Sequence, residues 1–130
     1  MIYLDSSALV KLILDEPESR PLMQWLAERA DLPLVSSIVH RVEVPRAVWR
    51  ADPSALPRSL RQVRSVQKIV LSNAVLDIAA TIPPQELRSL EAIHIASALV
   101  IRRELTSFVS YDSRLLAAAR TAGLHAASPA

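Results

Sequence analysis

The sequence predicts one three-layer α/β/α domain with a central, mostly parallel sheet of four to five strands. Short β-branched apolar runs alternate with longer segments of helical periodicity along all 130 residues. Apolar residues make up 51% and charged residues 22% of the chain, as in globular rather than disordered proteins. A chain of this length buries one sizeable core, and no linker or repeat divides it, so residues 1–130 are predicted to form a single domain.

The strands are predicted where short buried-type runs lie between turn signals or helical segments. In chain order they are Met1–Leu4, Leu32–Val35, Gln67–Leu71 and Ser107–Ser110. Apolar residues at three- and four-residue spacing predict helices at Ser7–Leu14, Ser19–Ala30, Ile38–Arg50, Ser54–Ser65, Ala74–Ile82, Leu87–Glu104 and Asp112–Ala122. Pro21 falls in the first turn of the second helix, where proline is tolerated. Gly123 suits the left-handed position just after the last helix.

Composition excludes several classes of site. The single glycine excludes the phosphate-binding loop and the dinucleotide fingerprint, because each needs several glycines for close backbone approach to phosphate. The absence of Cys excludes disulfides, thiolate zinc sites and cysteine nucleophiles. No apolar run reaches the roughly 20 residues that span a bilayer, and Asp5 interrupts the region where a signal peptide would be apolar. We therefore expect a cytoplasmic protein without a membrane segment.

Two aspartates stand where neighbouring strands of the predicted sheet end. Asp5 directly follows the first strand, and Asp112 follows Ser107–Ser110 after one intervening residue. Because ligands bind beyond the carboxyl ends of parallel strands, both carboxylates are expected at one rim of the sheet. Each aspartate also opens a helix, so the alternative is that each simply caps a helix N-terminus.

Two glutamates lie beside core-facing apolar positions. Glu43 follows the second strand on its helix, and Glu91 lies near the start of Leu87–Glu104. Burying a carboxylate without a partner costs several kcal/mol, which a bound cation would offset. Four oxygen donors without Cys suit a hard cation such as Mg²⁺ or Mn²⁺. Clustered carboxylates also predict at least one raised pKa.

These acids lie within four motifs that occur in order along nearly the whole chain. The motifs are Tyr3-Leu4-Asp5-Ser6-Ser7-Ala8-Leu9-Val10-Lys11, Ser36-Ser37 leading to Glu43, Leu90-Glu91-Ala92-Ile93-His94-Ile95-Ala96, and Ser110-Tyr111-Asp112-Ser113-Arg114-Leu115. Together they resemble the PIN-domain ribonucleases, and more narrowly the VapC toxins of bacterial toxin–antitoxin pairs. The resemblance implies a PIN-like fold and metal-assisted hydrolysis of RNA phosphodiesters in a structured RNA such as tRNA or rRNA, leaving a 5′-phosphate.

The resemblance also implies which residues form the site. Asp5, Glu43, Glu91 and Asp112 would be the catalytic and Mg²⁺- or Mn²⁺-binding residues, with Ser6 and Ser110 as supporting polar groups. The family usually has Asp where this chain has Glu91, and Pro45 would kink or end the helix that carries Glu43. These two departures keep open an alternative function, that of a catalytically impaired module that binds RNA or an antitoxin.

Other hydrolytic chemistries fit less well. A histidine-based ribonuclease needs two imidazoles at one phosphate, and His40, His94 and His125 lie on separate segments. His94, one turn after Glu91, could touch the acidic site, but a half-buried histidine satisfied by a hydrogen bond is the favoured interpretation. An aspartyl-phosphate phosphatase would need a second Asp where this chain has Ser7.

A basic stripe lies between residues 41 and 68, with seven bases against two acids and a local net charge of +5, where the whole chain has +2. Its members are Arg41, Arg46, Arg50, Arg58, Arg61, Arg64 and Lys68. Three- and four-residue spacings place them on helix faces, which favours an RNA-binding wall beside the acids, although an ordinary solvated surface has the same pattern. Because aromatic residues make up only 4% of the chain, we expect recognition of RNA shape and backbone rather than base stacking.

The resemblance implies two protein partners as well. One is a VapB-type antitoxin whose C-terminal segment wraps the toxin. The other is a second copy of the chain, since a homodimer is usual in the family. Apolar residues of the early helices could form the dimer interface or the internal core; they are Leu9, Leu12, Ile13, Leu22, Trp25 and Leu26.

Overall fold

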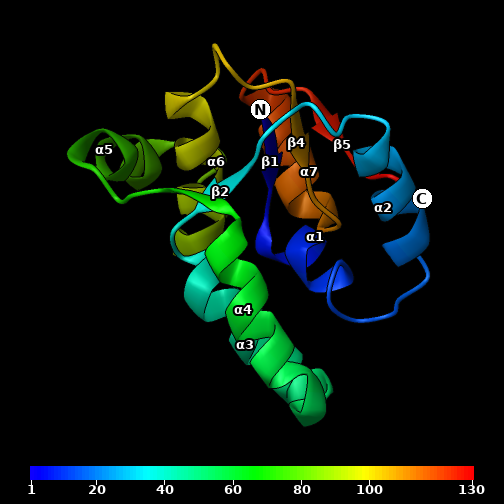
Figure 1. The fold of residues 1–130 in the computed structure, drawn as a ribbon. Helices are drawn as coiled ribbons and strands as arrows, with labels where there is room; N and C mark the ends of the chain where they lie inside the picture. The colour runs from blue at the N-terminus through cyan, green and yellow to red at the C-terminus, as the bar shows by residue number, and fades with distance from the viewer.

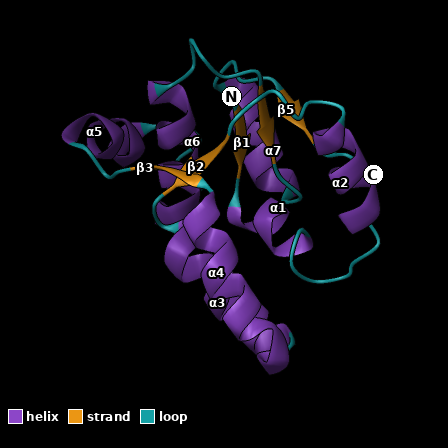
Figure 2. Ribbon diagram, viewed as in Figure 1, coloured by secondary structure: helices purple, strands orange, loops and turns teal.

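The computed structural model describes residues 1–130 and contains one five-stranded, all-parallel sheet. The strands lie in the order β3-β2-β1-β4-β5, with β1 at the centre (Figures 1 and 2). Their bounds are β1 Ile2–Leu4, β2 Leu34–Ser37, β3 Gln67–Ile69, β4 Ser107–Val109 and β5 Ala126–Ala127. Tyr3 pairs with Val35 of β2 on one side and with Phe108 of β4 on the other. The predicted sheet is confirmed, with five strands and no antiparallel one.

Seven α-helices surround this sheet. They are α1 Ser6–Lys11, α2 Ser19–Ala27, α3 His40–Ala51, α4 Leu56–Ser65, α5 Asn73–Thr81, α6 Ser89–Val100 and α7 Ser113–Thr121, with a 3₁₀ turn at Pro53–Ala55. Helices α3 and α4 form a hairpin that projects at the bottom of Figure 1. None of the helices is long and apolar enough to cross a membrane.

The core consists of two clusters, one on each face of the sheet. Successive strand residues point to opposite faces, so Ile2 and Leu4 pack against α1 to α4, whereas Tyr3 packs with Phe108 against α6 and α7. This arrangement confirms the three layers. Leu9, Ile13 and Leu22 of the early helices lie within the first cluster at 0–4% exposure, so they are internal core of this chain.

Several boundaries differ from the predicted ones for local reasons. β2 begins two residues late because Pro33 precedes it, and it ends in two buried serines, Ser36 and Ser37. The helix predicted to reach Glu104 ends at Val100, after which tight i to i−3 hydrogen bonds continue the chain. Gly123 has φ +85° just after α7, as predicted.

Pro45 does not end α3, so of the two predicted effects, a kink or an end, the structure excludes the end. The helix begins at His40, so Pro45 lies near its N-terminus and leaves only the carbonyl of Arg41 without a helical donor. Glu43 therefore lies in the first turn of α3, directly beyond the end of β2, rather than two turns into the helix.

Candidate active site

Asp5 and Asp112 lie at the same rim of the sheet, where β1 and β4 end and α1 and α7 begin. Both cap a helix N-terminus, so the capping role that the sequence left open is real. The Asp5 Oδ1 atom accepts the backbone N–H of Ala8 at 2.9 Å. The Asp112 Oδ1 atom accepts the N–H groups of Arg114 at 2.9 Å and Leu115 at 3.2 Å. Capping uses one oxygen of each carboxylate and leaves the other for the site.

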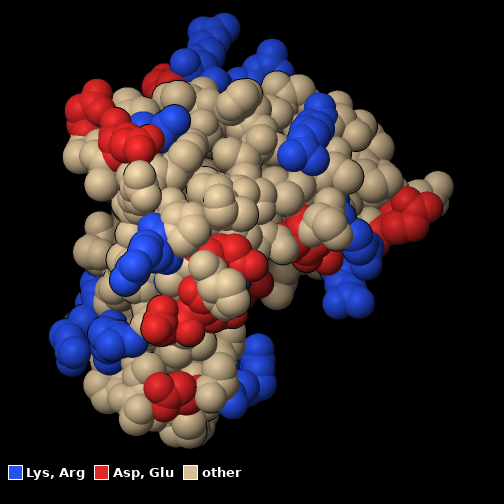
Figure 3. All heavy atoms as spheres, turned by 90° about the vertical axis from the view of Figure 1, so that its right-hand side faces the viewer, with Lys and Arg blue, Asp and Glu red and all other residues tan.

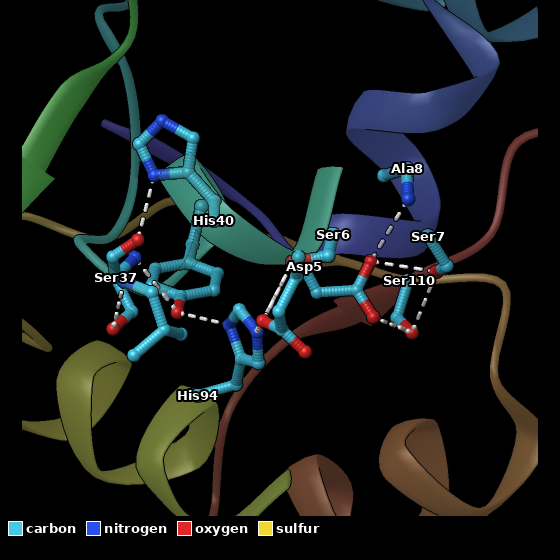
Figure 4. Close-up of polar contacts among 11 residues, drawn as sticks. Asp5, Ser6, Ser7, Ala8, Ser37, His40, His94 and Ser110 are labelled. Carbon is cyan, nitrogen blue, oxygen red and sulfur yellow. Dashed lines mark hydrogen bonds and ion pairs between the residues drawn. The ribbon is translucent and has the colours of Figure 1, made fainter. Parts of the chain in front are cut away.

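The Asp5 carboxylate is buried, with the residue only 3% exposed. Ser7 Oγ donates to Oδ1 at 2.7 Å, and Ser110 Oγ donates to Oδ2 at 2.6 Å (Figure 4). Burial raises the pKa of Asp5 above its ordinary value, although the nearby His94 and the hydrogen bonds from the two serines act in the opposite direction. A charged Asp5 is therefore not fully compensated by the protein alone, which is the property expected of a cation ligand.

Ser110 joins the two aspartates. Its hydroxyl donates to Asp5 and accepts the backbone N–H of Asp112 at 3.0 Å. The Asp112 Oδ2 atom has no hydrogen-bond partner in the protein. One serine thus connects the buried Asp5 carboxylate to the backbone of Asp112.

Glu43 approaches the same rim from α3. Its Oε1 atom accepts Ser6 Oγ at 2.8 Å and lies 2.7 Å from His94 Nε2, while Oε2 has no hydrogen-bond partner. Burial disfavours the charged form, but the hydrogen bonds from His94 and Ser6 hold the pKa of Glu43 below its ordinary value. Ser6 is the chain neighbour of Asp5, so Glu43 lies next to the aspartate pair.

Glu91 stands apart from this arrangement. It lies in the first turn of α6, where Oε2 accepts the backbone N–H of Arg88 at 3.1 Å and lies 3.8 Å from the guanidinium of Arg114. Its hydrogen bond to Arg88 makes it a cap of α6. Among the four predicted acids, Ser110 links Asp5 to the backbone of Asp112, and Ser6, the chain neighbour of Asp5, binds Glu43.

The chemistry of the donors fits a hard divalent cation, because every candidate ligand atom is a carboxylate oxygen. Glu43 Oε2 and Asp112 Oδ2 have no protein partner, and Asp5 has a raised pKa. No three Asp, Glu or His side chains lie close enough together in this structure to hold one ion. The residues thus supply suitable oxygens without an already closed coordination sphere.

A pocket of about 370 Å³ opens beside Glu43. Its lining residues are Ser6, Ser7, Val10, Val42, Glu43, Arg46, Ala47, Arg50 and Leu90. Two bases of the predicted stripe, Arg46 and Arg50, therefore line a hollow that also contains a site acid. A divalent cation at Glu43 and the guanidinium groups of Arg46 and Arg50 would each attract a phosphate to this pocket.

The other bases of the stripe differ in their surroundings. All five are exposed, namely Arg41, Arg58, Arg61, Arg64 and Lys68, but Arg58 also donates a hydrogen bond to the backbone carbonyl of Ile13. Figure 3 shows Lys and Arg side chains on both flanks of the lower lobe, which the α3–α4 hairpin forms, and Asp and Glu side chains gathered beside it. Arg58 thus belongs at least in part to the fold, and the exposed members are free to meet a polyanion.

The main feature that the sequence did not reveal is the surroundings of His94. The residue is 3% exposed rather than half-buried, and its Nδ1 lies 2.6 Å from the hydroxyl oxygen of Tyr3. Hydrogen bonds satisfy the His94 ring, as the favoured interpretation predicted. The ring also contacts Glu43, as the alternative interpretation predicted. The only sequence signal was its position one turn after Glu91. No sequence signal pointed to Tyr3, because tyrosine is an ordinary residue of a buried strand.

Comparisons with known proteins show the family to which this fold belongs. The PIN domain family model matches residues 2–121. Ribonuclease VapC47 of Mycobacterium tuberculosis is 42% identical over 132 residues, which cover 99% of this chain and 97% of that protein. Ribonuclease VapC46 of the same organism is 41% identical over 128 residues, with 98% and 97% covered.

Two solved structures share the fold at low sequence identity. Mycobacterium tuberculosis VapC20, described as a Sarcin-Ricin loop cleaving toxin, aligns with a TM-score of 0.71 and 15% identity over 95% of this chain and 96% of that one. FitAcB from Neisseria gonorrhoeae aligns with a TM-score of 0.63 and 17% identity over 97% and 96%. At these identities the likeness concerns the fold alone.

Proposed function

Because this chain belongs to the PIN-domain family and is a VapC-type endoribonuclease toxin, we propose that it cleaves RNA at the rim where β1 and β4 end. The observation that carries this assignment is the buried Asp5 carboxylate, joined through Ser110 to Asp112 and lying beside Glu43. Asp5 is the central acid, because it is the most buried of the set and has a raised pKa. Ser6 and Ser110 hold the flanking acids in place.

The metal is Mg²⁺ or Mn²⁺ in this proposal. Asp5, Glu43 and Asp112 would hold the ion through their carboxylate oxygens, with Glu91 as a fourth acid at the edge of the site. A bound ion supplies an activated water at neutral pH and stabilises charge on the phosphate oxygens. Within the chain, Ser110 keeps Asp5 and Asp112 adjacent, and Ser6 fixes one oxygen of Glu43.

The substrate is a structured RNA, such as tRNA or rRNA. Arg46 and Arg50 line the pocket beside Glu43 and would bind phosphates that flank the cleaved bond. The exposed arginines of α4 extend this basic wall. The chain offers few aromatic side chains for stacking, which favours shape and backbone recognition, and the fold neighbour VapC20 is a toxin that cleaves a folded RNA loop.

The partner is an antitoxin protein of the VapB type, encoded beside this chain. VapC ribonucleases at 41–42% identity and the FitAcB structure support a two-protein system. An antitoxin arginine inserted among the acids would be a charge-assisted pair of the kind that carboxylates favour. A homodimer in the cytoplasm completes the proposal.

The test is cleavage of total RNA by the chain purified without its antitoxin. With Mg²⁺ or Mn²⁺ the wild type should produce fragments with 5′-phosphates, and Asp5→Asn should produce none. Asp77→Asn on the exposed face of α5 is the matched control and should cleave normally. Full activity of Asp5→Asn, or cleavage that persists in excess EDTA, would refute the metal-dependent site and favour a histidine mechanism.

One observation favours the alternative of an impaired, RNA- or antitoxin-binding module. Glu91 is occupied by the Arg88 N–H and faces Arg114 instead of joining the other acids. The same assay with Glu91→Asp decides between the two functions. Activity in the wild type supports the ribonuclease, whereas activity only in Glu91→Asp supports the impaired module.

A further inference from the structure

We propose that Tyr3 and His94 form a positioning pair that fixes the Glu43 carboxylate, with Tyr3 setting the ring proton of His94 on Nε2. The inference rests on the proposed function, since Glu43 matters there as a site acid. Its basis is a continuous chain of hydrogen bonds between side chains that come from β1, α6 and α3 (Figure 4).

The direction of the first hydrogen bond follows from the partners of Tyr3. The Tyr3 oxygen accepts the backbone N–H of Ser37 at 3.0 Å, and its shortest hydrogen bond is with His94 Nδ1 at 2.6 Å. Tyr3 is fully buried, and a phenol keeps its proton at neutral pH. A buried donor without an acceptor is costly, so the hydroxyl proton points to Nδ1.

The second hydrogen bond follows from the first. A neutral imidazole whose Nδ1 accepts carries its proton on Nε2. That nitrogen lies 2.7 Å from Glu43 Oε1, so it donates to the carboxylate. Ser6 Oγ gives Oε1 a second donor at 2.8 Å, which leaves Oε2 as the oxygen without a protein partner. The pair thus decides which oxygen of Glu43 is available to the site.

The core holds this pair rigidly. Tyr3 stacks on Phe108 with ring centroids 5.0 Å apart and planes 8° apart. His94 meets Tyr3 edge-on, with centroids 5.9 Å apart and planes 86° apart. Neither ring can turn without disturbing a packed layer of the sheet, so the orientation of Glu43 is set before any ligand arrives.

His40 shows what a purely structural histidine does in this fold. It is fully buried, and both ring nitrogens lie beside backbone carbonyls, Ser37 O at 2.6 Å and Val63 O at 3.0 Å. Every hydrogen-bond partner of His94 is instead a side chain, and one of them is a site acid. This contrast separates a positioning histidine from one that satisfies the backbone.

The first test needs no activity. In ¹⁵N-histidine NMR of the wild type without metal, the His94 ring should show the tautomer protonated on Nε2. Tyr3→Phe removes only the hydroxyl and should shift His94 toward a mixture of tautomers, while the His40 signals stay unchanged. A His94 ring protonated on Nδ1 in the wild type, or one unaffected by Tyr3→Phe, would overturn the proposal.

The second test uses two replacements of His94. The amide of Gln places an N–H donor near the position of Nε2, whereas Asn is too short to reach Glu43. On a labelled RNA hairpin that contains the main cleavage site mapped in total RNA, His94→Asn should lower kcat about 10- to 100-fold with KM little changed. His94→Gln should recover most of that loss.

Equal loss in the Gln and Asn variants, or a change confined to KM, would contradict the positioning role. If the wild type cleaves nothing, the proposed function fails, but the NMR result still decides whether Tyr3 sets the His94 proton. A correct tautomer in an inactive wild type would support the pair and refute the ribonuclease site, so the two failures are distinguishable.

Discussion

Asp5→Asn should make the metal-free protein more stable at neutral pH while removing its proposed central ligand. The substitution keeps the shape of the side chain and its Oδ1 atom, which accepts the Ala8 N–H at the start of α1. It replaces a buried charge, in a residue only 3% exposed, by a neutral amide. The amide nitrogen would donate to Ser110 Oγ, whose hydroxyl can rotate to accept it.

The magnitude follows from two opposing contributions. Removing a carboxylate from water costs several kcal/mol even after relaxation. Hydrogen bonds to a charged group each contribute about 1.5–3 kcal/mol, and Asp5 has three, from Ala8, Ser7 and Ser110. Because the pKa of Asp5 is raised, the hydrogen bonds do not fully offset the burial. We expect Asp5→Asn to raise the free energy of unfolding of the metal-free protein by about 1–2 kcal/mol at pH 7. For a domain of this size, that corresponds to a rise of roughly 4–8 °C in Tm.

The pH dependence gives this prediction its sign. The folded protein holds the Asp5 proton to higher pH than the unfolded chain, whose Asp has the ordinary value of 3.8. The cost of the charge is therefore absent below about pH 3.8, grows as pH rises toward the raised folded value, and is constant above it. The advantage of Asp5→Asn should be larger at pH 7 than at pH 4.

Urea unfolding in EDTA, at several pH values between 4 and 7, measures the effect without interference from metal ions. Asp52→Asn is the matched control, because Asp52 also caps a helical turn, through Ser54, but is exposed. It should change stability by less than about 0.5 kcal/mol. An Asp5→Asn protein that is less stable than the wild type at pH 7, or whose advantage grows toward acid pH, would refute the reasoning.

Three further changes probe other parts of the molecule. Glu91→Ala should lower the free energy of unfolding by about 1 kcal/mol, because it removes the acceptor of the Arg88 N–H at the start of α6. Glu91→Gln should lower it by less in the same urea titration. Equal losses in the two variants would exclude the capping role. Phe108→Ala should lower the free energy of unfolding by about 3–5 kcal/mol, because the Phe108 ring is fully buried. A urea midpoint close to that of the wild type would contradict this packing. Arg61→Ala combined with Arg64→Ala should reduce the salt slope of RNA binding by up to about two, measured by filter binding over a range of KCl; an unchanged slope would identify ordinary surface.

Local signals in the sequence were enough to predict the central strands and the aspartates that follow them. A buried strand reads as a short apolar run, and an acid directly after it falls at the sheet rim wherever parallel strands alternate with helices. This pattern predicts the position of Asp5 and Asp112 at the rim, and the capping role that was the alternative is observed for both. Gly123 was placed correctly because only a left-handed residue suits the end of α7.

The remaining features depend on partners that are distant in sequence. Tyr3 and His94 are 91 residues apart, and Arg58 binds a carbonyl 45 residues away, so no local pattern connects either pair. β5 is a pair of alanines that joins the sheet only through the main chain of β4, and alanine carries no strand signal. Pro45 lies within α3 and removes one backbone hydrogen bond without ending the helix, because the helix continues to Ala51.

Helix α3 carries both the acid Glu43 and the pocket arginines Arg46 and Arg50, three and seven residues further along. At 1.5 Å per residue these intervals correspond to about 4.5 and 10.5 Å along one stiff rod. Any tilt of the hairpin would move the acid and the two arginines as one body. In the proposed function, this helix would therefore fix the distance between a phosphate bound by Arg46 or Arg50 and the bond cleaved beside Glu43.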